Sequence, residues 1–322
     1  YEVSSASVTL LKSINDLEGL EPYLGYNTAM QGYLFLVSAI YYRSSWKYKN
    51  RAFRYCLLDA GHLLGSIEAS ALLRQGSLQI NYDIEREKLN RIFGFEEREW
   101  FLAGATMAEP IPQSKVDAIE FELPYVEGSG SFEANALIEQ AYGETMRFES
   151  CKREEKVPSF SYQKEKLQET IFSRRSQRGF NEEGITKGQF NYIMDLIHQP
   201  IPSDCDEEVS IYVVVNRVLD MPLGLYRNGK YIKYGDFARK AGYLSLEQYT
   251  LSTQGAVAFF LTSKAKNYQA LYQKAGIIGH RLYIAAQYLD IGCSGIGAYY
   301  DDEVNTFVEN DEMVLYTLAI GK

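Results

Sequence analysis

Two stretches of the chain repeat one order of apolar and polar positions. The runs GYLFLVSAIYY from Gly32 and GAVAFFLTSKA from Gly255 are short, apolar and rich in β-branched and aromatic residues, which predicts strands buried on both faces. The runs AGHLLGSIEASALL from Ala60 and AGIIGHRLYIAAQYL from Ala275 place small and apolar residues at helical spacing, which predicts two largely buried helices.

The two predicted helices lie 215 positions apart (275 − 60), and Asn90 and Asn305 keep the same spacing. Around these asparagines, DIEREKLNRIFGF and DDEVNTFVEN predict short helices that follow a loop. A series of strand, helix, loop and helix that occurs twice favours tandem copies of one unit. A chance likeness between two buried helices is the alternative.

Further elements are predicted only upstream of the second stretch. KLQETIFSRRSQRGF from Lys166 and TKGQFNYIMDLI from Thr186 have helical spacing, and VSIYVVVNRV from Val209 predicts a strand. Asn228-Gly229 then separates alternating aromatic residues, and this pair favours the tight turn of a β-hairpin.

The residues between the two stretches lose this periodicity. EGSGSFE and CKREEKVPS have the composition of turns and solvated linkers, although IEFELPYV alternates apolar and acidic residues and predicts a strand. We therefore divide the chain into a partial copy over residues 1–107, a linker over residues 108–160 and a complete copy over residues 161–322.

Composition narrows the classes of partner. A formal net charge of −9 disfavours binding to nucleic acid or to an anionic membrane surface. No apolar run approaches the ~18 residues of a membrane span. The four cysteines are scattered without a CxxC pair and the three histidines lie far apart, which predicts no metal site and fits reduced thiols in a cytoplasmic protein. The chain begins with Tyr1 rather than Met, so the sequence leaves open whether Tyr1 is the natural N-terminus.

Two segments carry candidate chemistry. Residues 173–178, SRRSQR, place three guanidinium groups and two hydroxyls in six positions, and arginine forks match the oxygens of a phosphate. The alternative is a solvated basic turn with ordinary surface salt bridges. Residues 292–297, GCSGIG, follow the second buried helix, and glycine lets a backbone approach a flat ligand closely. Glycines that merely end a helix are the alternative there.

These segments resemble the nitroreductase superfamily. SRRSQRGF looks like its RRSxRxF opening, and GIIGHRLYIAAQYLDIGCSGIGAYYDDEVNTFV with the closing DEMVLYTLAIGK is similar to its C-terminal half. The closest branch is the SagB-type dehydrogenases, which include azoline oxidases acting on ribosomal peptides, and RSSWKYKNRAFRYCLLDAGHLLG in the first copy is similar to that branch as well. The resemblance implies an α+β nitroreductase-like fold with tandem copies, FMN at an interface between two such domains, and a homodimer.

The resemblance also implies roles for individual residues. The expected phosphate contacts are Arg174, Arg175, Ser176, Arg178 and Lys322, and the backbone expected near the isoalloxazine ring is that of Gly295, Ile296 and Gly297. Lys47-Tyr48 matches a pair associated with catalysis; the alternative is a snorkelling lysine and a packed tyrosine at a helix start. The first copy lacks an RRSxR segment and has RQGSLQINYD in place of the glycine loop, so it is expected to hold no FMN and to act as a pseudo-partner or lid.

The expected function is that of an FMN-dependent oxidoreductase that dehydrogenates an azoline to an azole in a peptide. One alternative is an NAD(P)H-dependent reductase of nitro or quinone compounds, and another is a degenerate flavoprotein-like module that binds a peptide. The substrate is expected to be a peptide or a small molecule. One segment departs from the branch: IPSDCDEEVS is acidic where the branch has a small segment containing Gly and His, which leaves the substrate preference open. His62 and His280 are expected to be helix residues with satisfied hydrogen bonds rather than catalytic bases.

Overall fold

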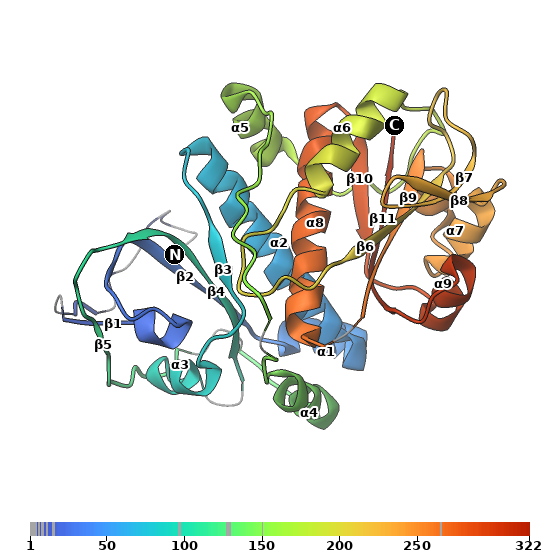
Figure 1. Ribbon diagram of the computed structural model, residues 1–322. Helices are drawn as coiled ribbons and strands as arrows, with labels where there is room; N and C mark the ends of the chain where they lie inside the picture. Colours follow the sequence, from blue (N-terminus) through green and yellow to red (C-terminus); the bar gives the residue numbers. More distant parts are fainter. Residues whose placement is uncertain are drawn as a thin grey trace.

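The computed structural model of the chain describes residues 5, 7, 10, 12–14, 17–95, 98–126, 130–149, 151–264 and 266–322. Tyr1, whose status as the natural N-terminus the sequence leaves open, lies outside the described residues. Two long helices cross at the centre of the molecule, with one sheet on either side of them (Figure 1).

The C-terminal half is built on a six-stranded antiparallel sheet with the strand order β10-β11-β9-β6-β7-β8. Its strands are β6 (Ser210–Val215), β7 (Gly224–Arg227), β8 (Lys230–Tyr234), β9 (Val257–Ser263), β10 (Gly292–Ile296) and β11 (Met313–Gly321). Its helices are α5 (Lys164–Ser173), α6 (Lys187–Ile197), α7 (Ala238–Leu244), α8 (Tyr268–Tyr288), α9 (Asp301–Val308) and the π-helical turn η3 (Tyr249–Thr253). Asn228 and Gly229 both have positive φ, 46° and 77°, as a type I′ turn requires, so the predicted hairpin is confirmed.

The N-terminal half has a three-stranded antiparallel sheet with the order β2-β4-β3 and a short parallel pair, β1 and β5. Its strands are β1 (Glu18–Gly19), β2 (Met30–Ala39), β3 (Gln79–Asn81), β4 (Trp100–Pro110) and β5 (Asp117–Ala118). Its helices are α1 (Tyr42–Tyr48), α2 (Ala52–Leu73), α3 (Arg86–Ile92), α4 (Ala136–Thr145) and the 3-10 turns η1 (Glu21–Leu24) and η2 (Lys49–Arg51).

Both halves contain a unit of the same topology. In the N-terminal half, β4 lies between β2 and β3, and in the C-terminal half β11 lies between β9 and β10; all four pairings are antiparallel. In each unit a long helix joins the first strand to the second, and a short helix joins the second to the third. The strands and helices predicted from the two repeated stretches are therefore confirmed. Their origin as tandem copies stays a prediction.

The long helices α2 and α8 cross at glycines that occupy the same place in the predicted repeat. A Cβ atom on Gly61 would lie 2.1 Å from the carbonyl oxygen of Gln273, and one on Gly276 would lie 2.3 Å from that of Leu58. Only glycine fits at such distances, so the two backbones touch at this point. Residues 42–73 are long and apolar enough to cross a membrane, but 56% of their most apolar window is buried inside the structure, as in a core helix.

Two predictions for strands need correction. β9 is buried along its whole length, whereas in β2 only Val37 is buried. The reason is position: β9 lies inside the six-stranded sheet with apolar clusters on both faces, and β2 is the edge of a small sheet. The predicted strand IEFELPYV does not form either, because the chain leaves β5 at Ala118 and continues without regular pairing.

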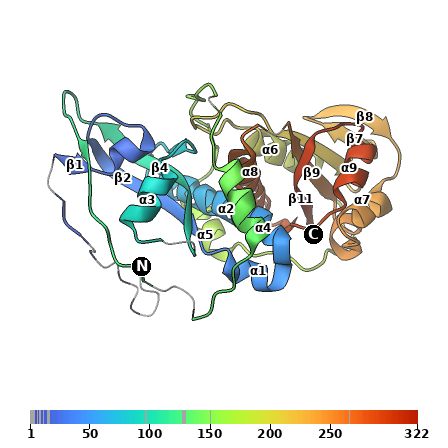
Figure 2. The same ribbon diagram turned by 90° about the horizontal axis from the view of Figure 1, so that it is seen from below.

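Two predictions for helices also need correction. Helix α5 ends at Ser173, so the following RRSQRGF segment is extended rather than helical. The expected linker 108–160 contains a helix, α4, which lies beside α2 (Figure 2). This helix is stabilised by tertiary packing, since the ring of Tyr142 stacks on that of Trp100 with centroids 4.2 Å apart.

We expect the substitution Gly61→Ala to lower the free energy of unfolding by about 2–3 kcal/mol, because the added methyl group forces the backbones of α2 and α8 apart. The control is Gly143→Ala in the exposed part of α4, where no atom lies within 4 Å of an added Cβ. That variant should be unchanged or more stable by up to about 1 kcal/mol. Urea denaturation measures both, and an equal effect of the two substitutions would contradict a close helix crossing.

Candidate active site

The basic segment after α5 lies along the free edge of β10. Ser176 pairs with Cys293 as a parallel bridge, and the N–H of Gln177 donates to the carbonyl oxygen of Cys293 at 3.0 Å. Four residues further on, the N–H of Asn181 donates to the carbonyl oxygen of Lys322 at 2.6 Å. The fold therefore joins the three predicted cofactor-binding parts of the chain, which are the basic segment, the glycine loop and the C-terminal lysine.

Tyr283 connects the basic segment to the glycine loop. Its hydroxyl lies 2.8 Å from that of Ser176 and accepts the N–H of Gly295 at 2.6 Å. The guanidinium of Arg174 lies over the Tyr283 ring, 5.2 Å from its centroid. Ser176, Gly295 and Arg174 are thus held in one arrangement by a tyrosine of α8 that the sequence reasoning did not single out.

The cations of this region have no carboxylate partners among the described residues. Arg175, Arg178 and Lys322 are exposed and Arg174 is half-buried. Within the part of the chain that the structure describes, none of the four forms a salt bridge. In a chain of net charge −9, such an uncompensated group attracts a multiply charged anion.

A cavity of about 400 Å³ opens beside the glycine loop. Both halves of the chain line it: the residues are Ser44, Tyr48, Tyr55, Leu58, Asp59, Gln248, Leu251, Gly295, Ile296, Gly297, Ala298 and Tyr316. Its size is that of a site for a cofactor or small ligand. The predicted residues Gly295, Ile296 and Gly297 therefore face a cavity, whereas sequence reasoning missed Tyr55, Asp59 and Tyr316.

Two of the glycines are required by tyrosines that pack against them. A Cβ atom on Gly295 would lie 2.0 Å from the hydroxyl oxygen of Tyr316, and one on Gly297 would lie 2.5 Å from the ring of Tyr55. Tyr55 belongs to α2 and Gly297 follows β10, so this contact joins the two halves of the chain at the cavity.

Two arginines of the N-terminal half hold the loop after β10. The Nε–H of Arg51 donates to the carbonyl oxygen of Gly297 at 3.0 Å. Arg51 and Arg54 both bind the Asp301 carboxylate, at 3.4 and 2.6 Å. The pattern RAFRY, with arginines three apart on one helix face, was the available sequence signal for this contact.

The edges of β3 and β10 differ although they occupy corresponding places. Tyr82 and Asp83 follow β3 as Gly297 and Ala298 follow β10. The N–H groups of Tyr82 and Asp83 donate to the carboxylate of Asp204 at 2.9 to 3.0 Å. No acceptor among the described residues binds the N–H groups of Gly297 and Ala298. Beside β10, two lining residues of the cavity thus have backbone N–H groups without an acceptor among the described residues, while the N–H groups beside β3 are occupied.

The predicted catalytic pair is separated. Tyr48 lines the cavity, and its ring meets that of Tyr55 with centroids 4.8 Å apart. Lys47 is exposed and is not part of the lining; its ammonium lies 5.1 Å from the centroid of the Tyr48 ring. Asp59 of α2 lines the cavity with an exposed side chain, and partial desolvation by the surrounding protein raises the pKa of its carboxyl above the ordinary value.

The histidines His62 and His280 lie at the helix crossing, as expected of satisfied helix residues. The Nε2 atom of His62 lies 3.1 Å from the Tyr316 hydroxyl, and that of His280 lies 3.1 Å from the Ser66 hydroxyl. Burial lowers the pKa of His62 to about 4 and the pKa of His280 to about 3. Both rings are therefore neutral at pH 7. Tyr316, which is hydrogen-bonded to His62, also lines the cavity.

Comparison with known proteins shows which fold the chain resembles. Residues 171–322 match the model of the Nitroreductase family. The structure is similar to that of a protein from Anabaena variabilis named as a nitroreductase, with a TM-score of 0.72 and 26% sequence identity over 90% of this chain and 69% of that chain. The chain thus has a nitroreductase-like fold of mixed helices and sheets, and the likeness covers both halves.

Smaller solved proteins match about half of the chain. An oxidoreductase of Bacillus subtilis, YcnD, shows 18% identity and a TM-score of 0.38 over 48% of this chain and 65% of its own. An FMN-dependent nitroreductase from Clostridium difficile shows 14% identity and a TM-score of 0.37 over 47% of this chain and 84% of its own. No curated protein matches the chain.

We expect the two buried histidines to make folding stability depend on pH. Both titrate near pH 6.5 in an unfolded chain, and their pKa values of about 4 and about 3 are lower in the fold. Below pH 6.5 the unfolded state therefore binds protons that the folded state does not, and stability is lost as the pH falls. At pH 5 the loss is about 2 kcal/mol for each histidine.

Urea denaturation at pH 7 and pH 5 tests this expectation, with His280→Gln as the comparison. Between pH 7 and pH 5, the two histidines together lower the free energy of unfolding of the unchanged protein, and in the variant about half of this decrease should be lost. If its pH dependence equals that of the unchanged protein, His280 does not titrate as the burial implies.

Proposed function

We propose that the chain is an FMN-dependent oxidoreductase with its cofactor between the two halves. The observation that carries the proposal is a group of cations beside a cavity whose lining includes backbone donors; among the described residues, neither the cations nor these donors have a partner. The phosphate of FMN would meet Arg174, Arg175, Ser176, Arg178 and Lys322, and the ring would lie in the cavity against Gly295, Ile296 and Gly297.

The residues present fit this cofactor in charge and in shape. A phosphate dianion would neutralise cations that have no partner among the described residues. The N–H groups of Gly297 and Ala298 would donate to acceptor atoms along the edge of a flat ring, as the N–H groups of Tyr82 and Asp83 donate to the Asp204 carboxylate at the corresponding place beside β3. The nitroreductase-like fold and the FMN-dependent relative support the same cofactor.

Several residues of this chain would prepare the site. Bound FMN supplies a hydride acceptor, which the side chains of the protein cannot provide. Arg51 fixes the loop that carries these backbone donors by binding the carbonyl oxygen of Gly297. Oxidation of a ring also releases a proton; the Asp59 carboxylate can take it, and the Tyr48 hydroxyl, one of three phenols that line the cavity, can pass it on. We therefore propose Tyr48 and Asp59 for this role, with Lys47 acting through the ring of Tyr48.

The proposed substrate is an azoline ring in a peptide, which becomes an azole by loss of two hydrogens. The support is the likeness of the Lys47-Tyr48 region to azoline oxidases, together with the place of Tyr48 in the cavity. An NAD(P)H-dependent nitro or quinone reductase is the second candidate, and the name of the relative from Anabaena variabilis favours it. Anaerobic addition of NADPH distinguishes the two, because only the reductase would bleach its flavin rapidly.

We propose that the N-terminal half serves as a pseudo-partner that completes the site. It supplies Tyr48, Tyr55 and Asp59 to the cavity, so one chain already provides walls from two units. Association of two chains into a homodimer, and residence in the cytoplasm, are further proposals that this cavity does not require.

We expect the purified protein to show the absorption of bound flavin and to release FMN on denaturation. Arg174→Ala and Arg178→Ala should each weaken FMN binding by about 10- to 100-fold, because each removes a charge-assisted contact of about 1.5–3 kcal/mol. Lys187→Ala, which removes an exposed cation at the start of α6, is the matched control and should leave the affinity unchanged. Flavin fluorescence quenching measures the Kd. A colourless protein that takes up no added FMN would favour the peptide-binding module instead.

We expect Tyr48→Phe and Asp59→Asn to lower turnover by about 100-fold while FMN remains bound, because each removes a proton-transferring group from the cavity. Lys47→Ala should lower it by less than about tenfold, since this side chain lies outside the cavity. The measurement is the loss of two hydrogens from a thiazoline-containing peptide, followed by mass spectrometry. A larger loss for Lys47→Ala than for Tyr48→Phe would reverse the proposed roles.

A further inference from the structure

A second cluster of reactive side chains lies outside the candidate active site. The Sγ atoms of Cys151 and Cys205 are 3.3 Å apart, and the Sγ of Cys205 lies 3.9 Å from a carboxylate oxygen of Glu207. The three potential ligand atoms all lie within 4.8 Å of one another. Cys205 is fully buried, while Cys151 and Glu207 are half-buried, so a small ion can reach the group from one side.

Asn267 orients two of these three groups. Its side-chain Nδ2–H donates to the Sγ of Cys151 at 2.9 Å, and its backbone N–H donates to the carboxylate of Glu207 at 3.1 Å. Asn267 is the first residue before α8, but its side chain makes no cap for that helix. The partial positive charge at the N-terminus of α8 therefore lies near the sulfur and carboxylate atoms. The N–H groups of Asn267 donate to the same atoms. Such outer contacts are what fix ligands around a metal.

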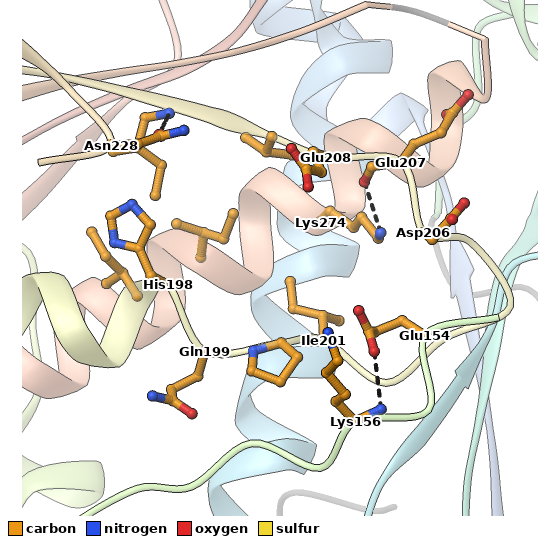
Figure 3. A pocket seen from close by; sticks show the side chains of 15 residues that line it. Glu154, Lys156, His198, Gln199, Ile201, Asp206, Glu207, Glu208, Asn228 and Lys274 are labelled. Atoms are coloured by element: carbon orange, nitrogen blue, oxygen red, sulfur yellow. Dashed lines mark hydrogen bonds between the residues drawn. The ribbon is translucent and has the colours of Figure 1, made fainter. Parts of the chain in front are cut away.

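The charge balance also fits a divalent cation. Two thiolates and one carboxylate around a divalent ion carry a net charge of −1. The ammonium group of Lys274 lies beside them and is almost fully buried, donating to the carbonyl oxygens of Cys205 and Glu207. Figure 3 shows its bond to Glu207 at the wall of a second cavity, of about 360 Å³. Lys274 thus supplies the single positive charge that neutralises the group.

We propose that Cys151, Cys205 and Glu207 bind a thiophilic divalent cation, with Zn²⁺ as the favoured ion and water in the fourth position. Two sulfur ligands and one oxygen ligand select zinc over magnesium or calcium. On binding, the two thiol protons pass to solvent and two Zn–S bonds form, so no oxidant or reductant is needed. The ion would join the segment around Cys151 to the loop that closes the edge of β3.

The test uses the full chain, reduced with a phosphine, freed of metal with a chelator and titrated with Zn²⁺ against a chromophoric competitor. We expect one Zn²⁺ per chain with a Kd below about 1 μM. Cys205→Ser and Glu207→Gln should weaken binding by about tenfold or more. Cys56→Ser replaces another buried cysteine, on α2, and should leave the zinc affinity unchanged.

Co²⁺ gives a second readout that does not depend on a variant folding. Bound by two thiolates, Co²⁺ should show sulfur-to-metal charge-transfer absorption in the unchanged protein. The proposal is overturned if the reduced chain binds neither ion, or if Cys205→Ser and Glu207→Gln bind zinc as tightly as the control Cys56→Ser. It is also overturned if the isolated protein carries a Cys151–Cys205 disulfide and binds no metal after reduction. None of these outcomes bears on the binding of FMN.

Discussion

The close contact of α2 and α8 at Gly61 and Gly276 is the constraint on which the candidate site depends. Because the backbones touch there, the loop after β10 lies against side chains of α2. The ring of Tyr55 takes the space that a side chain at residue 297 would need, and Arg51 binds the carbonyl oxygen of the same residue. A wider crossing would draw the two walls of the cavity apart. The geometry of the site is thus set by the crossing of two helices, which also supply Asp59 to the cavity and Tyr283 to the basic segment.

Similar topology in the two halves does not produce similar sites. Beside β3, the acidic segment that differs from the SagB-type pattern turns back onto the strand edge: Ser203 bridges to Ile80, and Asp204 binds the two N–H groups that follow. A carboxylate of the chain itself therefore occupies the N–H groups of Tyr82 and Asp83. The corresponding N–H groups of Gly297 and Ala298 have no acceptor among the described residues. This closure gives a physical reason why the N–H groups beside β3 are not available to a ligand. It also shows that these backbone positions suit an acceptor with negative charge.

Periodicity and turn residues in the sequence were sufficient for elements that the local pattern decides. The two long helices, the strand before each and the hairpin at Asn228-Gly229 are all found where the pattern predicts them. The pattern failed where a distant partner decides: RRSQRGF is extended because it pairs with Cys293, and α4 forms because Tyr142 packs on Trp100. No local signal reports such contacts.

The candidate site was predictable to the same degree. Residue types and order located the basic segment and the glycine loop, and their meeting at β10 follows from the fold. Adjacent residues of a helix point about 100° apart, and here Tyr48 lines the cavity while Lys47 does not. No pattern in the sequence indicates that Cys151 meets Cys205, since 54 residues separate them. The CxxC pattern reveals only metal sites in which two cysteine ligands lie close together in the sequence, within one turn of the chain. Ligands that meet across segments become visible only once the paths of those segments through the fold are known.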